Sequence, residues 1–136
     1  MIPVSDVVLL GHRTRDLDEG APEELARLPP ELRRIDAATV VATASASGRH
    51  AAGWLASTGH GVWLHLDLDV LDPESLPAVT YPQPGGLDWD QLAALMEPLA
   101  RSPRLLGISV ADFRPDLDPT GELAWQIVDL LGRTLP

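Results

Sequence analysis

The residues best suited to chemistry lie in one short segment, residues 65–73, with the sequence HLDLDVLDP. Side chains alternate across an extended strand, so His65, Asp67 and Asp69 are expected on one face and the apolar residues on the other. Two carboxylates at the end of an apolar strand repel each other and are costly to bury without a positive partner. Hard divalent cations favour oxygen ligands, so the pattern favours a metal site. Taken alone, an Asp-x-Asp pair also occurs in helix caps, arginine partners and solvated turns.

Length and composition indicate one globular domain. The chain has 136 residues, of which 45% are hydrophobic and 22% are charged. We therefore expect a single domain over residues 1–136, since domains commonly have about 100–150 residues. There is no cysteine, which excludes disulfides, thiolate metal sites and cysteine nucleophiles. This composition suits a reducing cytoplasm, which is the expected location.

The charge of the chain limits the kinds of partner that it is expected to bind. The formal net charge is −10, and every basic residue is an arginine. Such a surface repels phosphate backbones, so no nucleic-acid partner is expected. A negative field favours cationic small molecules or divalent cations, although many soluble proteins are equally acidic. No run approaches the roughly 18 apolar residues that span a bilayer, and the first residues resemble no signal peptide.

Short apolar runs alternate with amphipathic stretches along the chain. Strands are expected at residues 7–11, 32–36, 62–70 and 105–110, and the second could extend toward Val41. Helices are expected within residues 16–30 and at residues 50–57, 88–100 and 121–131, with Asp88 capping the third. The four tryptophans are expected to pack in the core or between helix and sheet. This alternation predicts an α/β fold with a mostly parallel sheet of about four strands, and ligands bind beyond the carboxyl ends of such strands.

Three motifs carry a resemblance to a known family. Residues 65–87 resemble the form Phe-Asp-Val-Asp-x-x-Asp-Pro, then Pro-Ala-x-Gly-Thr-Pro, then Gly-Gly-Leu, with Thr80-Tyr81 in place of Gly-Thr. Residues 11–16 resemble Gly-x-Arg-x-x-Asp, and residues 106–115 resemble a segment written Asp-x-x-Glu-x-Asn-Pro. Together they resemble the later part of the ureohydrolase (arginase, agmatinase and formiminoglutamase) family domain.

The resemblance implies a fold and a chemistry. The fold would be part of a three-layer αβα sandwich with a mostly parallel sheet. Members cleave a guanidino carbon–nitrogen bond, of arginine or agmatine type, and release urea, or they act on formimino analogues. They use two manganese ions that activate a shared water. Asp67 and Asp69 would be metal ligands, and the substrate would be a small guanidino or amidine compound.

The sequence also departs from the family pattern. The other family ligands lie in Gly-Gly-x-His and Asp-x-His-x-Asp segments, and neither occurs here. In the family, the strand that carries the second segment separates the first strand here from the Asp67 strand. We therefore expect an incomplete site that is inactive in this chain alone. Unpaired strand edges also lead us to expect a homo-oligomer or a complementing chain.

Four further residues are candidates for the site. Asp112 stands where the family has a glutamate that holds the guanidinium, and it is one methylene shorter; it could instead pair with an arginine or cap a loop. Asp16 aligns with a residue that contacts the substrate's amino group in some members, or it is a plain turn residue. His65 replaces a small residue and would support the ligands, or it packs in the core. Asp72 ends the strand and would support the ligands from the following turn. No residue is assigned as a catalytic acid, base or nucleophile.

Three functions stay open. The chain could belong to an arginase-like hydrolase whose missing segment another chain supplies. It could be a non-catalytic remnant that binds partners through an open sheet edge. It could belong to a binuclear hydrolase acting on a formimino or acyl amide substrate.

Overall fold

The computed structural model describes residues 2–15, 17 and 19–136. The strands are β1 (Val8–His12), β2 (Arg33–Asp36), β3 (Val62–Asp67) and β4 (Leu105–Ala111). The helices are α1 (Ala21–Ala26), α2 (Ala37–Thr58), α3 (Trp89–Ala100) and α4 (Glu122–Thr134), and short 3-10 turns span Val4–Asp6, Leu68–Val70 and Pro115–Leu117. Strands and helices alternate along the chain, so the predicted α/β class is confirmed.

The four strands form two separate parallel pairs. Strand β1 pairs with β2, and β3 pairs with β4. Both connections contain a helix, as a parallel crossover requires. Within the described part of the chain, no strand lies between β1 and β3, so the two pairs do not join into one sheet.

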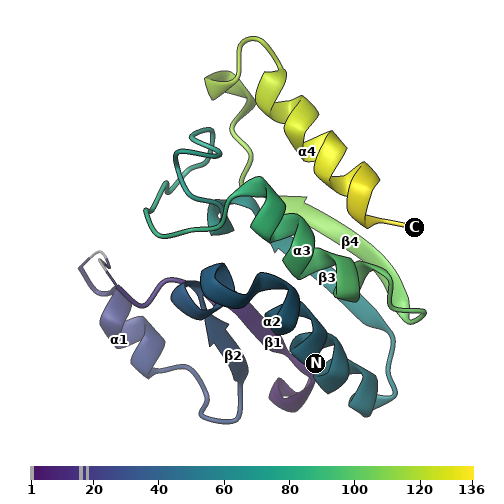
Figure 1. Cartoon of the computed structure of the whole chain (residues 1–136). Coiled ribbons are helices and arrows are strands. Elements are labelled where there is room, and N and C mark those ends of the chain that lie inside the picture. Colours follow the sequence, from purple (N-terminus) through teal and green to yellow (C-terminus); the bar gives the residue numbers. More distant parts are fainter. Residues whose placement is uncertain (1, 16, 18) are drawn as a thin grey trace.

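Helices α2 and α3 hold the two pairs together. Figure 1 shows them side by side in front of the strands, with α4 beyond α3. They approach closely at Gly48, where a Cβ would lie 2.3 Å from the backbone oxygen of Leu95. A buried core fills the space between helices and strands; among its members are Val40, Leu66, Leu68, Leu71, Leu76, Leu87, Leu92, Leu95, Met96, Ile127 and Leu130.

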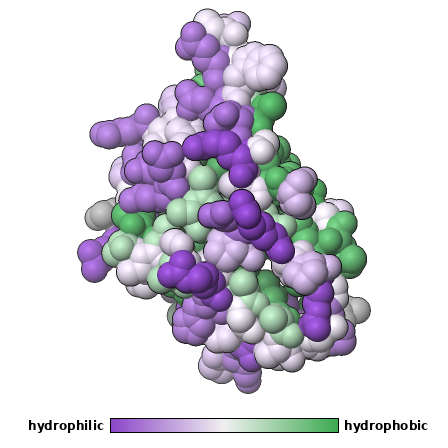
Figure 2. Space-filling model, turned by 45° about the vertical axis from the view of Figure 1, so that its right-hand side comes forward, coloured by the Kyte–Doolittle hydropathy of each residue, from purple (hydrophilic) through white to green (hydrophobic). Residues whose placement is uncertain are grey.

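One face of β3 is covered and the other is open. Val62 and Leu66 are buried, whereas Trp63, His65 and Asp67 on the opposite face are exposed. The prediction that the tryptophans pack in the core or between helix and sheet is wrong for Trp63 (62% exposed) and Trp125 (73% exposed). Figure 2 shows hydrophobic surface gathered along one side of the molecule.

Several element boundaries differ from the expected ones, and the largest difference is that the helix expected at residues 50–57 spans Ala37–Thr58. Residue 37 begins α2, because the Asp36 side chain accepts a hydrogen bond from the Thr39 amide and caps the helix. The possibility that the second strand extends toward Val41 is therefore wrong. Strand β3 ends at Asp67, and Asp69 lies in the 3-10 turn that follows, so Asp69 does not continue the strand's alternating pattern.

Candidate metal centre

Three carboxylates converge at the carboxyl ends of β3 and β4. Asp67 is the last residue of β3, Asp69 lies in the turn after it, and Asp112 directly follows β4. The register pairs Asp67 with Ala111, which places Asp112 one residue beyond the paired position. Each side chain offers one oxygen, and these three oxygens lie within 4.8 Å of one another. The structure thus brings together two predicted metal ligands and one predicted substrate-binding residue.

The negative charges of the three clustered carboxylates are not fully balanced by nearby positive charge. Burial, followed by the charges of Asp67 and Asp112, raises the pKa of Asp69 to about 6. The neighbouring Arg13 acts in the opposite direction but does not restore the usual value. Burial and like charges disfavour the ionised form of this carboxyl group, and a nearby cation would favour it. Three acidic oxygens suit a hard divalent cation in both type and spacing.

Asp112 is held in place by its backbone and by a neighbouring loop. Its φ angle is +68°, a left-handed conformation that residues other than glycine adopt infrequently. Its Oδ2 accepts a hydrogen bond from the Thr80 amide at 3.2 Å. Beside it, Phe113 forms an antiparallel bridge with Val79. The loop between β3 and α3 therefore fixes the carboxylate that β4 delivers.

Arg13 connects the end of β1 to the turn that carries Asp69. Its guanidinium donates to the carbonyl oxygens of six residues at 3.0–3.3 Å, and these residues are Gly11, Asp69, Val70, Leu71, Gln83 and Pro84. Burial lowers the pKa of Arg13, while the nearby Asp69 and Asp72 carboxylates act against that shift. Sequence reasoning did not single out this residue. Arg13 is the arginine of the Gly-x-Arg-x-x-Asp pattern that residues 11–16 resemble, and this pattern was the signal that could have identified it.

Asp72 anchors the same loop from its other side. Its carboxylate accepts from the amides of Glu74 (3.0 Å), Gly85 (2.8 Å) and Gly86 (3.3 Å). The Glu74 hydrogen bond is the main cause that lowers the pKa of Asp72. A Cβ at Gly86 would lie 2.3 Å from Nη2 of Arg13 and 2.4 Å from the backbone carbon of Leu71, so only glycine fits beneath the guanidinium.

The remaining candidates lie apart from the cluster or outside the described residues. His65 shares the exposed face of Asp67, but its Nδ1 contacts Oγ of Ser109 at 2.8 Å. Nε1 of Trp63 donates to the same Ser109 oxygen at 3.1 Å, so these three side chains form a small polar group on the open face. Asp16, predicted to contact the substrate, lies outside the described residues.

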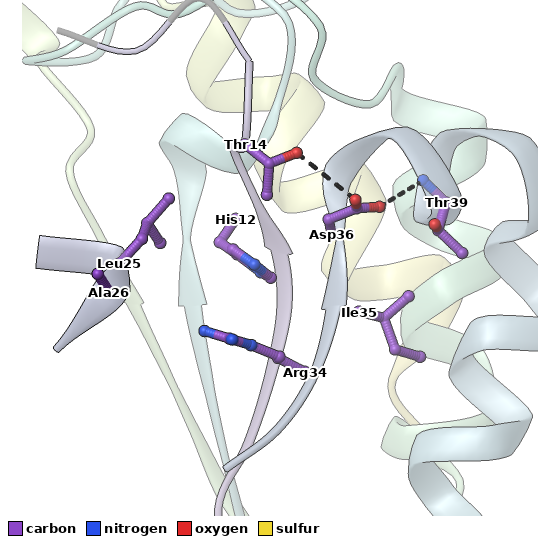
Figure 3. A pocket seen from close by; sticks show the side chains of 8 residues that line it. All are labelled: His12, Thr14, Leu25, Ala26, Arg34, Ile35, Asp36 and Thr39. Atoms are coloured by element: carbon purple, nitrogen blue, oxygen red, sulfur yellow. Dashed lines mark hydrogen bonds between the residues drawn. The ribbon is translucent and has the colours of Figure 1, made fainter. Parts of the chain in front are cut away.

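A hollow separate from the carboxylate cluster lies against β1, β2 and α1. Figure 3 shows its lining of His12, Thr14, Leu25, Ala26, Arg34, Ile35, Asp36 and Thr39. Asp36 accepts from the Thr39 amide at 2.9 Å and from Thr14 at 3.5 Å. Nδ1 of His12 is buried and has no hydrogen-bond partner among the described residues, and burial lowers the pKa of this imidazole. None of the three clustered carboxylates lines this hollow.

The α/β fold with carboxylates at its strand ends defines a class of candidate metal-binding proteins. Residues 2–135 match the model of the Arginase family, and the chain belongs to that family. It is 37% identical over 73 residues to a formimidoylglutamase of Klebsiella pneumoniae, covering 48% of this chain and 23% of that protein. It is 36% identical over 62 residues to an N(1)-aminopropylagmatine ureohydrolase of Thermus thermophilus, covering 46% and 21% respectively.

Solved structures give the same relationship in three dimensions. The arginase of Bacillus caldovelox superposes with a TM-score of 0.79 at 29% identity, covering 98% of this chain and 44% of that chain. The arginase of Bacillus subtilis gives 0.80 at 26% identity, covering 98% and 46%. The fold is therefore part of an arginase-like αβα sandwich, and the chain spans less than half the length of these arginases. No described helix is both long and apolar enough to cross a membrane.

Proposed function

We propose that this chain supplies Asp67 and Asp69 to a binuclear manganese site in a ureohydrolase, with Asp112 beside them to bind the substrate. The enzyme would cleave a guanidino carbon–nitrogen bond of arginine or agmatine type and release urea. One observation carries the proposal: three carboxylate oxygens lie within 4.8 Å of one another at the carboxyl ends of two adjacent parallel strands. Membership of the arginase family supports manganese as the metal.

The donor set fits a divalent metal but supplies only part of its coordination. Asp67 and Asp69 would hold the ions, because burial and the charges of Asp67 and Asp112 raise the pKa of Asp69, and a bound cation would favour its ionised form. Arg13 and Asp72 would position the Asp69 turn, and His65 would support the metal ligands from the exposed face of β3. Bound divalent metals lower the pKa of a coordinated water and polarise the bond to be cleaved. With only these two carboxylates as ligands, two ions would stay mostly hydrated, so the chain alone would be incomplete and inactive.

Asp112 and Asp16 would recognise the substrate. We assign Asp112 to the guanidinium or amidine group, because its carboxylate follows β4 beside Asp67 and Asp69 and accepts a hydrogen bond from the Thr80 amide. An aspartate reaches less far than a glutamate, so the substrate would sit closer to β4 than it does in members with glutamate. Asp16 would contact the far end of the substrate.

A formimino substrate is the second candidate. The formimidoylglutamase of Klebsiella pneumoniae supports it, with 37% identity over 73 residues. A non-catalytic role as an interaction module is the third; it is favoured by β1 and β3, each of which pairs with one strand among the described residues. We also propose that residues 1–136 act as one partial domain in the cytoplasm, within a homo-oligomer or with a complementing chain. The core cluster that the described residues form supports the one-domain division.

The test is a reconstituted assay. This chain is co-expressed with an arginase segment bearing the missing histidine and Asp-x-His-x-Asp ligands, and urea release from arginine and agmatine is measured with and without manganese. Ammonia or formamide release from formiminoglutamate is measured in parallel. We expect manganese-dependent turnover that Asp67→Ala abolishes and that the exposed Glu74→Ala leaves unchanged. Equal tolerance of both substitutions, or no turnover on any substrate in a well-folded complex, would count against the proposal.

A further inference from the structure

Helix α4 carries large apolar side chains on the side that faces away from the core. Its buried side is formed by Ile127, Leu130 and Thr134, which are at most 8% exposed. Trp125 and Val128 lie on the opposite side and are 73% and 54% exposed. A helix that is anchored along one face normally has polar residues on the other. Figure 1 shows α4 on the outside of the molecule, beyond α3, so this outer stripe is open to a partner.

The outer stripe has a bulky side chain near one end and a gap near the other. Trp125, Val128 and Gly132 are spaced at i, i+3 and i+7, so they follow one line along the helix. A Cβ at Gly132 would meet no other part of the described chain within 4 Å. Glycine inside an exposed helix lowers the stability of that helix. A gap at this position has a use if the helix packs closely against another one.

The charged residues beside the stripe make the helix complementary to itself. Glu122 lies at the amino end of α4 and Arg133 at its carboxyl end. In an antiparallel pair of identical helices, each Glu122 would lie beside Arg133 of the second copy. Asp129 would lie beside the neutral Gln126. A parallel pair would instead place each charge beside its own copy, so the charge pattern favours the antiparallel arrangement.

Both charged ends have unused hydrogen-bonding capacity. Nε of Arg133 pairs with Asp129 at 2.9 Å and Nη1 pairs with Asp90 at 3.4 Å, which leaves Nη2 without a partner among the described residues. The backbone amide of Glu122 donates to Oγ1 of Thr120 at 3.4 Å, while its carboxylate has no partner within the described part of the chain. Two guanidinium–carboxylate pairs could therefore form, one at each end of the helix pair.

We propose that α4 binds α4 of a second copy of this chain, with the two helices antiparallel about a twofold axis. Trp125 of each copy packs over Gly132 of the other, and the two Val128 side chains meet at the axis. Tryptophan is the kind of residue that dominates the binding energy of such contacts. The inference gives a surface to the homo-oligomer of the proposed function, but it rests on α4 and not on the metal site.

The contact is small, so the dimer should be weak. Helix α4 has 13 residues and is about 20 Å long. Two such helices bury less than the roughly 1,200 Å² of standard interfaces, so we expect a dissociation constant on the order of 10–100 μM. Each chain has a net charge of −10. At 0.15 M salt the Debye length is about 8 Å, so repulsion between the two chains is largely screened.

Sedimentation equilibrium of the whole chain in 0.15 M salt tests the inference. We expect a monomer–dimer equilibrium that Trp125→Gln weakens about 30-fold, because each dimer loses two tryptophan contacts. The matched control is Leu106→Gln, since Leu106 is 74% exposed on β4, and it should leave the dimer unchanged. A chain that stays monomeric at millimolar concentration, or a dimer that both substitutions weaken equally, would overturn the inference.

Gly132→Leu separates the interface from the stability of the helix. Leucine has a higher helix propensity than glycine and meets open space in the monomer, so the melting temperature of the monomer should not fall. In the dimer, the leucine would occupy the place of Trp125 from the other copy. We therefore expect at least tenfold weaker association, and unchanged association would contradict the proposed packing.

Charge reversal tests the antiparallel arrangement. Glu122→Arg and Arg133→Glu should each self-associate about tenfold more weakly than the unaltered chain, because both ion pairs become like-charge pairs. An equimolar mixture of the two variants should regain the dimer, since each arginine then meets a glutamate of the other variant. Circular dichroism checks that both variants keep their helices. A mixture as weak as the single variants, or a single variant that dimerises normally, would overturn the arrangement.

Failure of the proposed function leaves a different record. The double variant Asp67→Asn, Asp69→Asn is expected to dimerise like the unaltered chain, because neither residue lies on α4. If the chain dimerises as described but the reconstituted complex shows no turnover with manganese, the dimer inference stands and the hydrolase assignment fails. Turnover by a chain that never dimerises through α4 would show the reverse.

Discussion

Replacing Arg13 with methionine tests whether one guanidinium holds the metal-site turn. Six carbonyl oxygens accept from Arg13 at 3.0–3.3 Å, and one of them, that of Val70, also accepts from the Leu87 amide. Methionine has a similar length and fills part of the volume, so the loss is mainly one of hydrogen bonds. Each net hydrogen bond contributes about 1 kcal/mol, but several of the acceptors belong to partly or fully exposed residues, where water replaces the donor. We therefore expect about 2–4 kcal/mol lower free energy of unfolding.

The assay is urea unfolding followed by tryptophan fluorescence. The dependence of the free energy of unfolding on urea concentration is compared between variants. The control is Arg101→Met, which removes an exposed pair with Glu97 and should cost at most about 0.5 kcal/mol. The loss in Arg13→Met is large against the roughly 5–15 kcal/mol that stabilises a typical domain. A change below about 1 kcal/mol, or one equal to that of the control, would refute the assignment of Arg13 as the residue that positions the Asp69 turn.

Three further predictions concern single residues. Because the pKa of Asp69 is raised to about 6, the metal-free folded state binds more protons than the unfolded state between about pH 4 and 6. Its free energy of unfolding should therefore fall as pH rises through this window, and Asp69→Asn should remove that part of the slope in urea titrations at a series of pH values. Gly48→Ala should lower the free energy of unfolding by about 1–3 kcal/mol, because its Cβ would meet the Leu95 carbonyl; thermal melts check this, and no loss would mean that the helices can separate without cost. In the reconstituted enzyme, Asp112→Asn should raise KM for a guanidino substrate at least tenfold with little change in manganese affinity, and a loss of manganese affinity like that of Asp67→Asn would reassign Asp112 as a metal ligand.

The strand-end position of the acidic residues could be predicted from local pattern. The apolar run before Asp67 and the proline after Asp72 indicate where a buried strand ends. The proximity of Asp112 required one more fact, that β3 and β4 are neighbours in register, and the order of elements alone does not settle this. The resemblance to ureohydrolases supplied it.

Other features depended on contacts that local pattern does not contain. The alternation rule placed Asp69 on the strand, but the chain turns at Asp67 because the Asp67 side chain accepts from the Asp69 amide, at 3.4 Å. Because Val40 and Val41 are β-branched, the second strand could have extended over them. The Asp36 cap instead starts a helix at Ala37. Arg13 was missed because the carbonyl oxygens it binds in the later loops belong to residues 56–71 positions away.

Manganese binding by the reconstituted complex, followed by electron paramagnetic resonance of the free ion, tests the central claim most directly. The unaltered complex should deplete the free manganese signal until two ions are bound per complex. Asp67→Asn should weaken that depletion at least tenfold, and the exposed Asp116→Asn should not. If the unaltered chain and Asp67→Asn deplete the signal equally, these carboxylates do not hold the metal and the account is wrong.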